Sequence, residues 1–180
     1  MTRRRWIIAL AAAALLAILG ASQYWVLSGR VATVDAGRLY RSAALPPGTL
    51  IDVCRRLGVR TVIDLRKAPQ DAGAEAAALA QAGIRHIHLP TGQVPTPDTV
   101  AQYLRIMDDA RNAPALVHCT HGVGRSGVFS AIYRMEYQGW PAWRAITEAM
   151  ILSGFGSFGP GNDKAKYLWS YTPRSAGRAR

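Results

Sequence analysis

Residues 118–127 read His-Cys-Thr-His-Gly-Val-Gly-Arg-Ser-Gly, and this stretch decides the fold expected for the chain. Ala115–His118 lead into it and predict a buried strand, while Val128–Tyr137 follow it and predict a helix with an apolar face. The turn between strand and helix contains Gly122 and Gly124. Backbone N–H groups of such a turn can point inward and, together with the helix N-terminus, form a cradle that binds anions.

The side chains of this stretch indicate a chemistry that uses the cradle. Cys119 lies at its mouth, where the dipoles that bind an anion also stabilise a thiolate. Arg125 returns at the far end, and its planar fork can grip two oxygens of a phosphoryl group. Ser126 can donate a hydrogen bond to the thiolate and help it leave. The pattern predicts phosphoryl transfer through a phosphocysteine, with no metal ion or cofactor. The phosphate-binding residues are expected to be Thr120, His121, Gly122, Val123, Gly124 and Arg125.

Strands and helices are predicted to alternate on both sides of this stretch. β-Branched and apolar residues predict buried strands at 59–65 and 84–89, in addition to Ala115–His118. The alternation predicts an α/β domain whose central, mostly parallel sheet is flanked by helices. A capping box beginning at Thr49 marks one helix start, and Thr96 with Pro97 marks another. The predicted helices cover 49–57, 71–82, 97–112, 128–137, 141–153 and a short closing segment.

The N-terminal 29 residues have a different composition from the rest. Arg3–Arg5 precede the apolar run Trp6–Leu27, which is long enough to span a bilayer. A cleaved signal peptide and an uncleaved anchor both fit, but the small residues Gly20 and Ser22 make a poor cleavage site. We therefore expect a single-pass membrane protein whose arginines stay in the cytoplasm and whose catalytic domain is periplasmic or otherwise extracytoplasmic. A connector, Ser28–Val34, is expected to lead into the domain.

The expected organisation is a membrane or signal-anchor helix at 1–29, a catalytic domain at 30–172 and a basic flexible tail at 173–180. Net charge is +11, but six of the arginines lie outside the domain, in 1–29 and 173–180. No Cys/His finger or aromatic RNA-binding motif accompanies this charge, so nucleic-acid binding is not expected. The expected partners are a phosphorylated protein or a small phosphomonoester, and a membrane.

The His-Cys-(five residues)-Arg-Ser pattern of residues 118–126 resembles the signature loop of the protein-tyrosine phosphatase superfamily. Residues 38–42 (Arg-Leu-Tyr-Arg-Ser) and 59–66 (Val-Arg-Thr-Val-Ile-Asp-Leu-Arg) resemble its atypical dual-specificity branch. This resemblance implies a cysteine phosphatase fold and a protein-tyrosine or dual-specificity phosphatase. It also implies that Cys119 is the nucleophile, Arg125 the phosphate binder and Ser126 the hydroxyl that aids thiolate departure. The position of His118 tunes the cysteine in this family.

Several alternatives stay open at the level of sequence. The atypical branch includes phosphoinositide and inositol-phosphate phosphatases, although the loop here has His121 and no lysine. A membrane-anchored module that binds phosphate without turnover is a second alternative, and the intact Cys119 and Arg125 weigh against it. A rhodanese-like sulfurtransferase is a third, but its loop is typically one residue shorter.

The general acid is where this sequence departs from the family pattern. Members of the family usually carry an aspartate about thirty residues before the cysteine, whereas residues 85–93 contain no carboxylate. Asp98 follows the proline-rich loop and is the first candidate acid, with a structural role in the first helical turn as its competitor. His121 and Asp163 are lesser candidates.

Four residues outside the loop, one aspartate, two histidines and one cysteine, have side chains that could also take part in a site. Asp64 is interpreted as structural, paired with an arginine. His86 and His88 alternate along one strand but make weak evidence for a metal site, so no metal is expected. Cys54 is expected to be buried, and in an oxidising compartment it could form an inactivating disulfide with Cys119.

Overall fold

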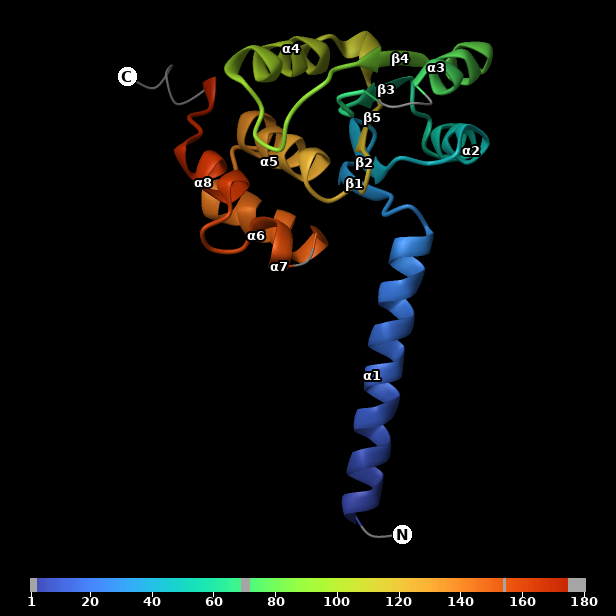
Figure 1. Ribbon diagram of the computed structural model, residues 1–180, viewed down its shortest axis with the longest axis vertical. Helices are drawn as coiled ribbons and strands as arrows, with labels where there is room; N and C mark the ends of the chain where they lie inside the picture. Colours follow the sequence, from blue (N-terminus) through green and yellow to red (C-terminus); the bar gives the residue numbers. More distant parts are fainter. Residues whose placement is uncertain (1–2, 69–71, 154, 175–180) are drawn as a thin grey trace.

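The computed structural model describes residues 3–68, 72–153 and 155–174. Within these residues, one five-stranded sheet has the order β1-β2-β5-β3-β4 (Figure 1). The β1–β2 pair is antiparallel, and the other three pairs are parallel. The predicted α/β class with a mostly parallel central sheet is confirmed. The strands are β1 (Ala32–Asp35), β2 (Leu39–Ala43), β3 (Thr61–Asp64), β4 (Arg85–His88) and β5 (Ala115–Cys119).

Helices cover both faces of this sheet (Figure 1). The described helices are α1 (Arg3–Leu27), which extends away from the sheet, α2 (Pro47–Leu57), α3 (Ala72–Gln81), α4 (Pro97–Asp108), a 3₁₀ turn η1 (Ala110–Asn112), α5 (Arg125–Tyr137), α6 (Ala142–Ser153), α7 (Phe155–Phe158) and α8 (Asp163–Ser170). Helices α2 and α3 pack on one face, and helices α4 to α8 contribute to the core on the other.

Strand alternation divides the core into two clusters. Val117 and Cys119 of β5 point into the larger cluster with α4 and α5, whereas Leu116 points into the smaller cluster with α2. Cys54 belongs to the smaller cluster, so the sheet lies between Cys54 and Cys119. Both cysteines are free thiols, and the predicted disulfide is wrong because it would have to cross the sheet. Burial raises the pKa of Cys54 to about 12, which suits an inert packing thiol.

The structure corrects several predicted boundaries. Residues 32–34 of the predicted connector belong to the edge strand β1, which ends at Asp35. Helix α2 begins at Pro47 with no side-chain cap, so the predicted capping box at Thr49 is wrong. Helix α5 begins at Arg125, three residues before the predicted start. Thr96 does cap α4, accepting a hydrogen bond from the Thr99 backbone N–H.

The predicted tail boundary is also corrected. Arg174 was assigned to the flexible tail, but its guanidinium forms ion pairs with Asp108 of α4 and Glu136 of α5. The chain therefore remains docked on the domain through Arg174, beyond the predicted end at 172. Residues 175–180 lie outside the described part of the chain.

Helix α1 extends away from the sheet in Figure 1. Its segment Arg5–Trp25 has the length and composition of a helix that could cross a membrane, and no part of it is buried against the domain. A signal sequence near the N-terminus has the same properties, so both interpretations of this segment remain predictions.

Candidate active site

The site is built where β5 ends and α5 begins. Cys119 is the last residue of β5, which lies between β2 and β3 at the centre of the sheet. Ligands of open α/β sheets bind at the carboxyl ends of parallel strands, and the loop 119–125 occupies this edge. Gly124 precedes the first turn of α5, so the helix N-terminus points at the loop, as predicted for an anion cradle.

A side chain at Gly122 and one at Gly124 would meet different neighbours. Gly122 has a φ of 68°, and a Cβ at this position would lie 2.5 Å from the backbone nitrogen of Ala43 in β2. No larger residue fits without moving the backbone. At Gly124 a Cβ would lie 2.7 Å from Oε1 of Gln93. A side chain at position 124 would displace the Gln93 amide from its place beside the loop.

Cys119 is buried, and its sulfur is surrounded by hydrogen-bond donors. Its Sγ lies 3.5 Å from the hydroxyl oxygen of Ser126. Burial acts to raise the pKa of the Cys119 thiol, but hydrogen bonds from Ser126 and from the backbone of Gly122, with the charge of Arg125, bring that pKa below its ordinary value. The site therefore favours the thiolate, the nucleophilic form of cysteine.

Arg125 lies at the far end of the loop from Cys119. Its Nη1 donates to the carbonyl oxygen of Leu65 at 3.1 Å, and its Nη2 donates to the Thr120 hydroxyl at 3.1 Å. Its Nε is buried and has no hydrogen-bond partner among the described residues. Two of the five N–H groups of the guanidinium are used in these bonds, so it is held in place and still has N–H groups to offer a ligand.

Two cavities meet at this loop. The catalytic pocket has a volume of about 220 Å³, and it is lined by Gln93, Cys119, His121, Val123, Gly124, Arg125, Ser157 and Lys164. A second cavity, called the side pocket here, has a volume of about 420 Å³. It is lined by Arg66, Lys67, Ala68, Thr91, Gly92, Gln93, Thr120 and Arg125. Gln93 and Arg125 line both cavities, so the two are contiguous.

A buried polar cluster supports the loop from the side of β3 and β4. His118 precedes the nucleophile, and its Nε2 lies 3.1 Å from Oε1 of Glu75 in α3. The other carboxylate oxygen of Glu75 accepts a hydrogen bond of 2.8 Å from Arg66. Arg66 also bonds to Asp64, as predicted for that aspartate. The cluster links the residue beside the nucleophile to the end of β3.

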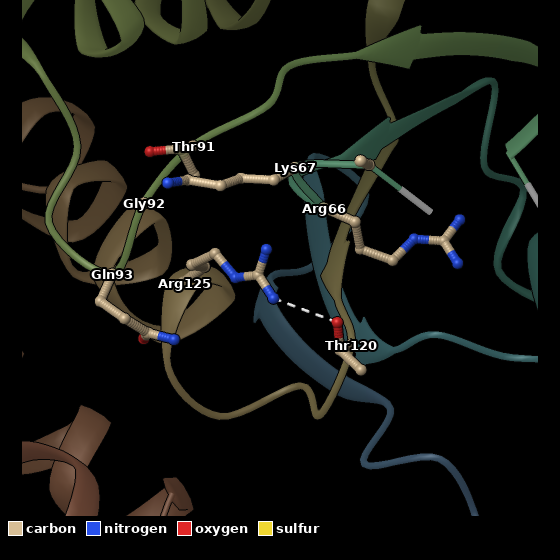
Figure 2. A pocket seen from close by; sticks show the side chains of 8 residues that line it. Arg66, Lys67, Thr91, Gly92, Gln93, Thr120 and Arg125 are labelled. Carbon is tan, nitrogen blue, oxygen red and sulfur yellow. Dashed lines mark hydrogen bonds between the residues drawn. The ribbon is translucent and has the colours of Figure 1, made fainter. Parts of the chain in front are cut away.

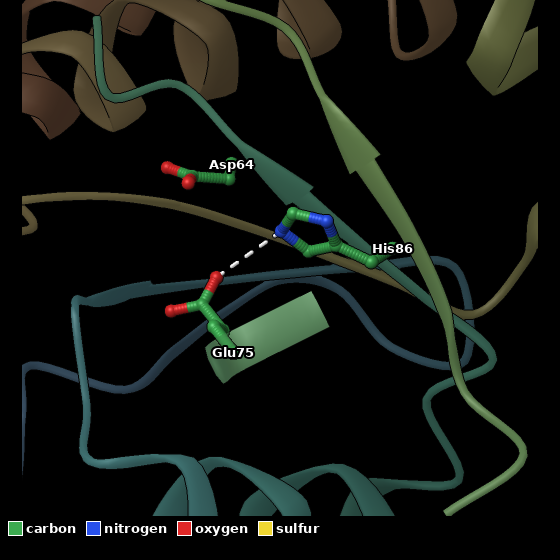
Figure 3. Close-up of side chains that lie close together, drawn as sticks. All are labelled: Asp64, Glu75 and His86. Carbon is green, nitrogen blue, oxygen red and sulfur yellow. Dashed lines mark hydrogen bonds and ion pairs between the residues drawn. The ribbon is translucent and has the colours of Figure 1, made fainter. Parts of the chain in front are cut away.

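Asp64, Glu75 and His86 lie close enough together to suggest a metal site (Figure 3). Their contacts favour a different interpretation. The guanidinium of Arg66 is bonded to both carboxylates, and His86 lies 3.2 Å from Oε1 of Glu75. A cation is thus already paired with these acids, so the cluster is explained as an ion-pair network.

Arg41 of β2 lies beneath the loop and is 1% exposed. Its Nη2 donates to the carbonyl oxygen of Gly122 at 3.3 Å, and none of the described carboxylates lies within ion-pair distance of it. Burial is the largest effect on Arg41 and lowers its pKa, while the negative charges of Glu148 and Cys119 act in the opposite direction. A buried positive charge therefore lies behind the nucleophile.

The structure brings the predicted loop residues together, but it leaves the candidate acids outside. Asp98 is exposed in the first turn of α4 and does not line either pocket. Asp163 pairs with Lys166 and also lies outside the lining. His121 lines the catalytic pocket. An acid role for Asp98 would require movement of the N-terminus of α4, and substitution of Asp98 tests it.

Sequence patterns did not single out several residues that line the two pockets or support the loop: Arg41, Arg66, Lys67, Glu75, Thr91, Gln93, Ser157 and Lys164. Lys67 and Thr91 could have been found from topology. They follow β3 and β4, and the carboxyl ends of neighbouring parallel strands meet at one edge of a sheet. Nothing in the sequence marks Glu75 as a residue of the site, because an acidic residue in the first turn of a helix is ordinarily explained by its interaction with the helix dipole.

A buried, acidified thiol under a backbone cradle, with an arginine at its far end, defines the protein-tyrosine phosphatase superfamily and its atypical dual-specificity branch. The chain belongs to the family described as DSP-PTPase phosphatase fused to NAD+ Kinase, whose model matches residues 50–153. The dual specificity protein phosphatase TpbA of Pseudomonas aeruginosa is 38% identical over 132 residues. That alignment covers 72% of this chain and 57% of TpbA, so this chain spans little more than half of its curated relative.

Solved structures agree with this assignment. The crystal structure of P. aeruginosa TpbA is similar with a TM-score of 0.58 and 34% identity, covering 75% of this chain and 81% of that one. The core catalytic domain of the PP-IP phosphatase SIW14 from S. cerevisiae, in complex with citrate, has a TM-score of 0.66 and 20% identity. It covers 83% of this chain and 89% of that one, and at this identity the likeness concerns the fold alone.

Proposed function

We propose that the protein is a cysteine-dependent phosphomonoester hydrolase that acts on phosphotyrosine or dual-specificity protein substrates. The observation that carries this proposal is the environment of Cys119. Its pKa is lowered by Ser126, the loop backbone and Arg125, although the thiol is buried. Nothing in packing alone requires an acidified thiol at the mouth of an anion cradle.

The proposed reaction has two steps. The phosphoryl group enters the catalytic pocket, and the Cys119 thiolate attacks phosphorus as the bond from phosphorus to the leaving oxygen breaks. Negative charge on the phosphoryl oxygens is stabilised by the loop N–H groups and Arg125. Water then attacks phosphorus, the S–P bond breaks, and the hydrogen bond from Ser126 stabilises the departing thiolate.

The more similar relative supports the proposed substrate class. TpbA, named a dual specificity protein phosphatase, is 38% identical, whereas the PP-IP phosphatase SIW14 resembles this chain at 20% identity. A protein substrate is therefore the first candidate. A small phosphorylated molecule such as an inositol phosphate is the second, because Arg66, Lys67 and Arg125 line the large side pocket.

We also propose that α1 anchors the enzyme in a membrane. The large apolar side chains described between Trp6 and Tyr24 are exposed, and burying them in a bilayer would remove this surface from water. Arginines before the segment favour a cytoplasmic N-terminus, which would place the catalytic domain on the other side. Labelling of an engineered surface cysteine in intact cells with an impermeant reagent tests this orientation; protection from the reagent would contradict it.

Hydrolysis of 4-nitrophenyl phosphate by the full chain in detergent, under reducing conditions, tests the activity. We expect turnover by the wild type and by Cys54→Ala, the matched control at the other cysteine, and no turnover by Cys119→Ser. Retained activity in Cys119→Ser would overturn the mechanism. A folded but inactive wild type that binds vanadate would favour the phosphate-binding module, and thiosulfate activity would favour the sulfurtransferase. Phosphotyrosine peptides, phosphoserine peptides and inositol phosphates then rank the substrate classes.

A further inference from the structure

Three successive carbonyl groups of the catalytic loop 119–125 accept hydrogen bonds from the N-terminal part of the chain. They belong to Thr120, His121 and Gly122, and their donors are the Ala44 backbone N–H at 3.3 Å, Arg30 Nη1 at 2.7 Å and Arg41 Nη2 at 3.3 Å. None of these donor residues lines the catalytic pocket. Figure 2 shows the pocket side of the loop, where Arg125 bonds to the Thr120 hydroxyl. The loop is therefore held from outside by residues that lie far before it in the sequence.

The orientation of each carbonyl also fixes the orientation of the N–H group that follows it. In a trans peptide the C=O and the N–H point in opposite directions, and the 121–122 peptide is trans. Because the His121 carbonyl is bonded to Arg30, the Gly122 N–H points away from Arg30, and this N–H is hydrogen-bonded to Cys119. Arg30 thus acts on the nucleophile through one peptide group, without touching the sulfur.

Arg30 has an unusual backbone conformation. Its φ is 51°, and it is the one residue other than glycine with a positive φ in the part of the chain that the structure describes. Left-handed backbone is unfavourable for a residue with a Cβ and persists only where the surrounding contacts fix it. One such contact is made by the preceding residue, Gly29, which is buried and whose carbonyl accepts a hydrogen bond of 2.8 Å from the Ala43 N–H. The strained turn directs the Arg30 side chain to the loop.

The same turn closes the C-terminal end of α1. The N–H of Arg30 donates to the carbonyl oxygen of Trp25 at 3.2 Å, and the N–H of Ser28 donates to that of Tyr24 at 2.9 Å. The Ser28 hydroxyl also donates to the Trp25 carbonyl, at 3.0 Å. Arg30 is therefore bonded to α1 through its backbone and to the catalytic loop through its side chain.

We propose that Arg30 is a positioning residue of the catalytic loop and that it couples the end of α1 to the nucleophile. It holds the 121–122 peptide in the orientation that turns the Gly122 N–H toward Cys119. This inference rests on the proposed function, because the orientation matters only if the loop binds a phosphoryl group. It goes beyond that function by making the junction after the proposed membrane helix part of the support of the active site.

Vanadate binding measured by calorimetry and hydrolysis of 4-nitrophenyl phosphate, both with the full chain in detergent, test the positioning role. Arg30→Met should weaken vanadate binding about fivefold, the loss expected for one hydrogen bond, and should lower kcat/KM by a similar factor. Arg30→Lys can still donate to the His121 carbonyl and should recover most of the affinity. Arg56→Met is the matched control and should bind vanadate as the wild type does, because it removes the same charge from an exposed arginine of α2 that lines neither pocket.

Gly29→Ala tests the coupling from the side of α1. The added methyl group would overlap the side chain of Leu45, and the φ of 71° is strained for alanine, so the turn must shift although the Arg30 side chain is kept. Vanadate binding should weaken about as much as in Arg30→Met. The double variant should bind no more weakly than the weaker single variant, because both changes act through one contact. Gly37→Ala, at another positive φ with open space around it, should bind normally.

Each part of the proposal can fail separately from the proposed function. Unchanged vanadate affinity in Arg30→Met, with the wild type active, would overturn the positioning role. Equal losses in Arg30→Met and Arg56→Met would overturn it too, since they would show only a general positive field. Additive losses in the double variant would overturn the coupling to α1. A wild type that neither binds vanadate nor hydrolyses the ester would contradict the proposed function, and the positioning role with it.

Discussion

Oε1 of Glu75 lies 3.1 Å from Nε2 of His118, and both side chains are buried behind the nucleophile loop. The pairing joins the first turn of α3 to the C-terminal end of the central strand β5. Glu75 also accepts a hydrogen bond from Arg66, which lines the side pocket. One carboxylate therefore positions both the residue that precedes Cys119 and a cation beside the substrate.

Replacing Glu75 with Gln should destabilise the fold by roughly 3 kcal/mol, because Arg66 would lose one of its two anionic partners inside the protein. Burial acts to raise the pKa of Glu75, but hydrogen bonds from His118 and His86 lower it below its ordinary value. Ionised Glu75 therefore stabilises the fold fully above the pKa that its carboxyl group has in the unfolded chain. This stabilisation is lost as pH falls through the lower pKa of Glu75 in the folded protein. Urea unfolding at neutral and acidic pH measures the free energy of unfolding of wild type and variant. The difference between the two should become smaller in acid, and a difference that does not change with pH would contradict this.

Ser126→Ala removes the hydroxyl that lies 3.5 Å from the Cys119 sulfur. A hydrogen bond to a charged group contributes about 1.5–3 kcal/mol, so the thiolate population at neutral pH should fall on the order of tenfold. The pH profile of Cys119 alkylation by iodoacetamide should move to higher pH. Ser130→Ala is the control, since that hydroxyl donates to the backbone carbonyl of Ser126 and not to the sulfur. Superimposable profiles for Ser126→Ala and wild type would show that the hydroxyl does not stabilise the thiolate.

Arg41→Met tests whether the buried cation beneath the loop acts on the nucleophile. The charges of Arg41 and the Cys119 thiolate favour one another, so removing Arg41 should raise the pKa of Cys119 and slow alkylation several-fold at neutral pH. Arg30→Met is the matched comparison. Arg30 also donates to a loop carbonyl, that of His121 at 2.7 Å, but its contact is exposed to solvent. Equal effects of the two substitutions would assign Arg41 a role in loop geometry alone.

Gly122→Ala should abolish phosphate binding. The added methyl group would lie 2.5 Å from the backbone nitrogen of Ala43, and the φ of 68° is strained for alanine. The loop must shift, and its N–H groups would no longer converge. Vanadate affinity measured by calorimetry should be lost, whereas Gly139→Ala, at another positive φ with open space around it, should bind vanadate normally. Normal vanadate binding by Gly122→Ala would contradict the convergent cradle.

The sequence predicted the loop and the α/β class better than it predicted the residues that support the loop. Cys119, Arg125 and Ser126 lie within one short segment, so their spacing alone placed them together. Glu75 and Arg41 come from elements far away in the sequence, and only the packing of α3 and β2 against the loop brings them to it. Strand β1 was missed because it is a four-residue edge strand, too short for a periodic pattern to stand out.

The identity of the general acid can be decided by leaving-group chemistry. Gln93 occupies the wall of the catalytic pocket, and no carboxylate of the described residues lines that pocket. If the enzyme has no general acid, the rate of hydrolysis should depend steeply on the leaving group. Phenyl phosphate should then react far more slowly than 4-nitrophenyl phosphate, because phenol has a higher pKa than 4-nitrophenol and leaves less readily. Gln93→Glu should narrow this difference by supplying a carboxyl group at the same place.

Asp98→Asn separates the two explanations of proton transfer. Because Asp98 is exposed and lines neither pocket, we expect the variant to hydrolyse both aryl phosphates at nearly the wild-type rate. A loss of about 10²-fold or more for phenyl phosphate, with 4-nitrophenyl phosphate little affected, would instead establish Asp98 as the acid, since a general acid contributes that much where the leaving group is poor. It would also show that the N-terminus of α4 moves over the loop during turnover. If the rate depends little on the leaving group in both wild type and Asp98→Asn, another group donates the proton, and His121 and Lys164 of the catalytic pocket are the side chains to replace next.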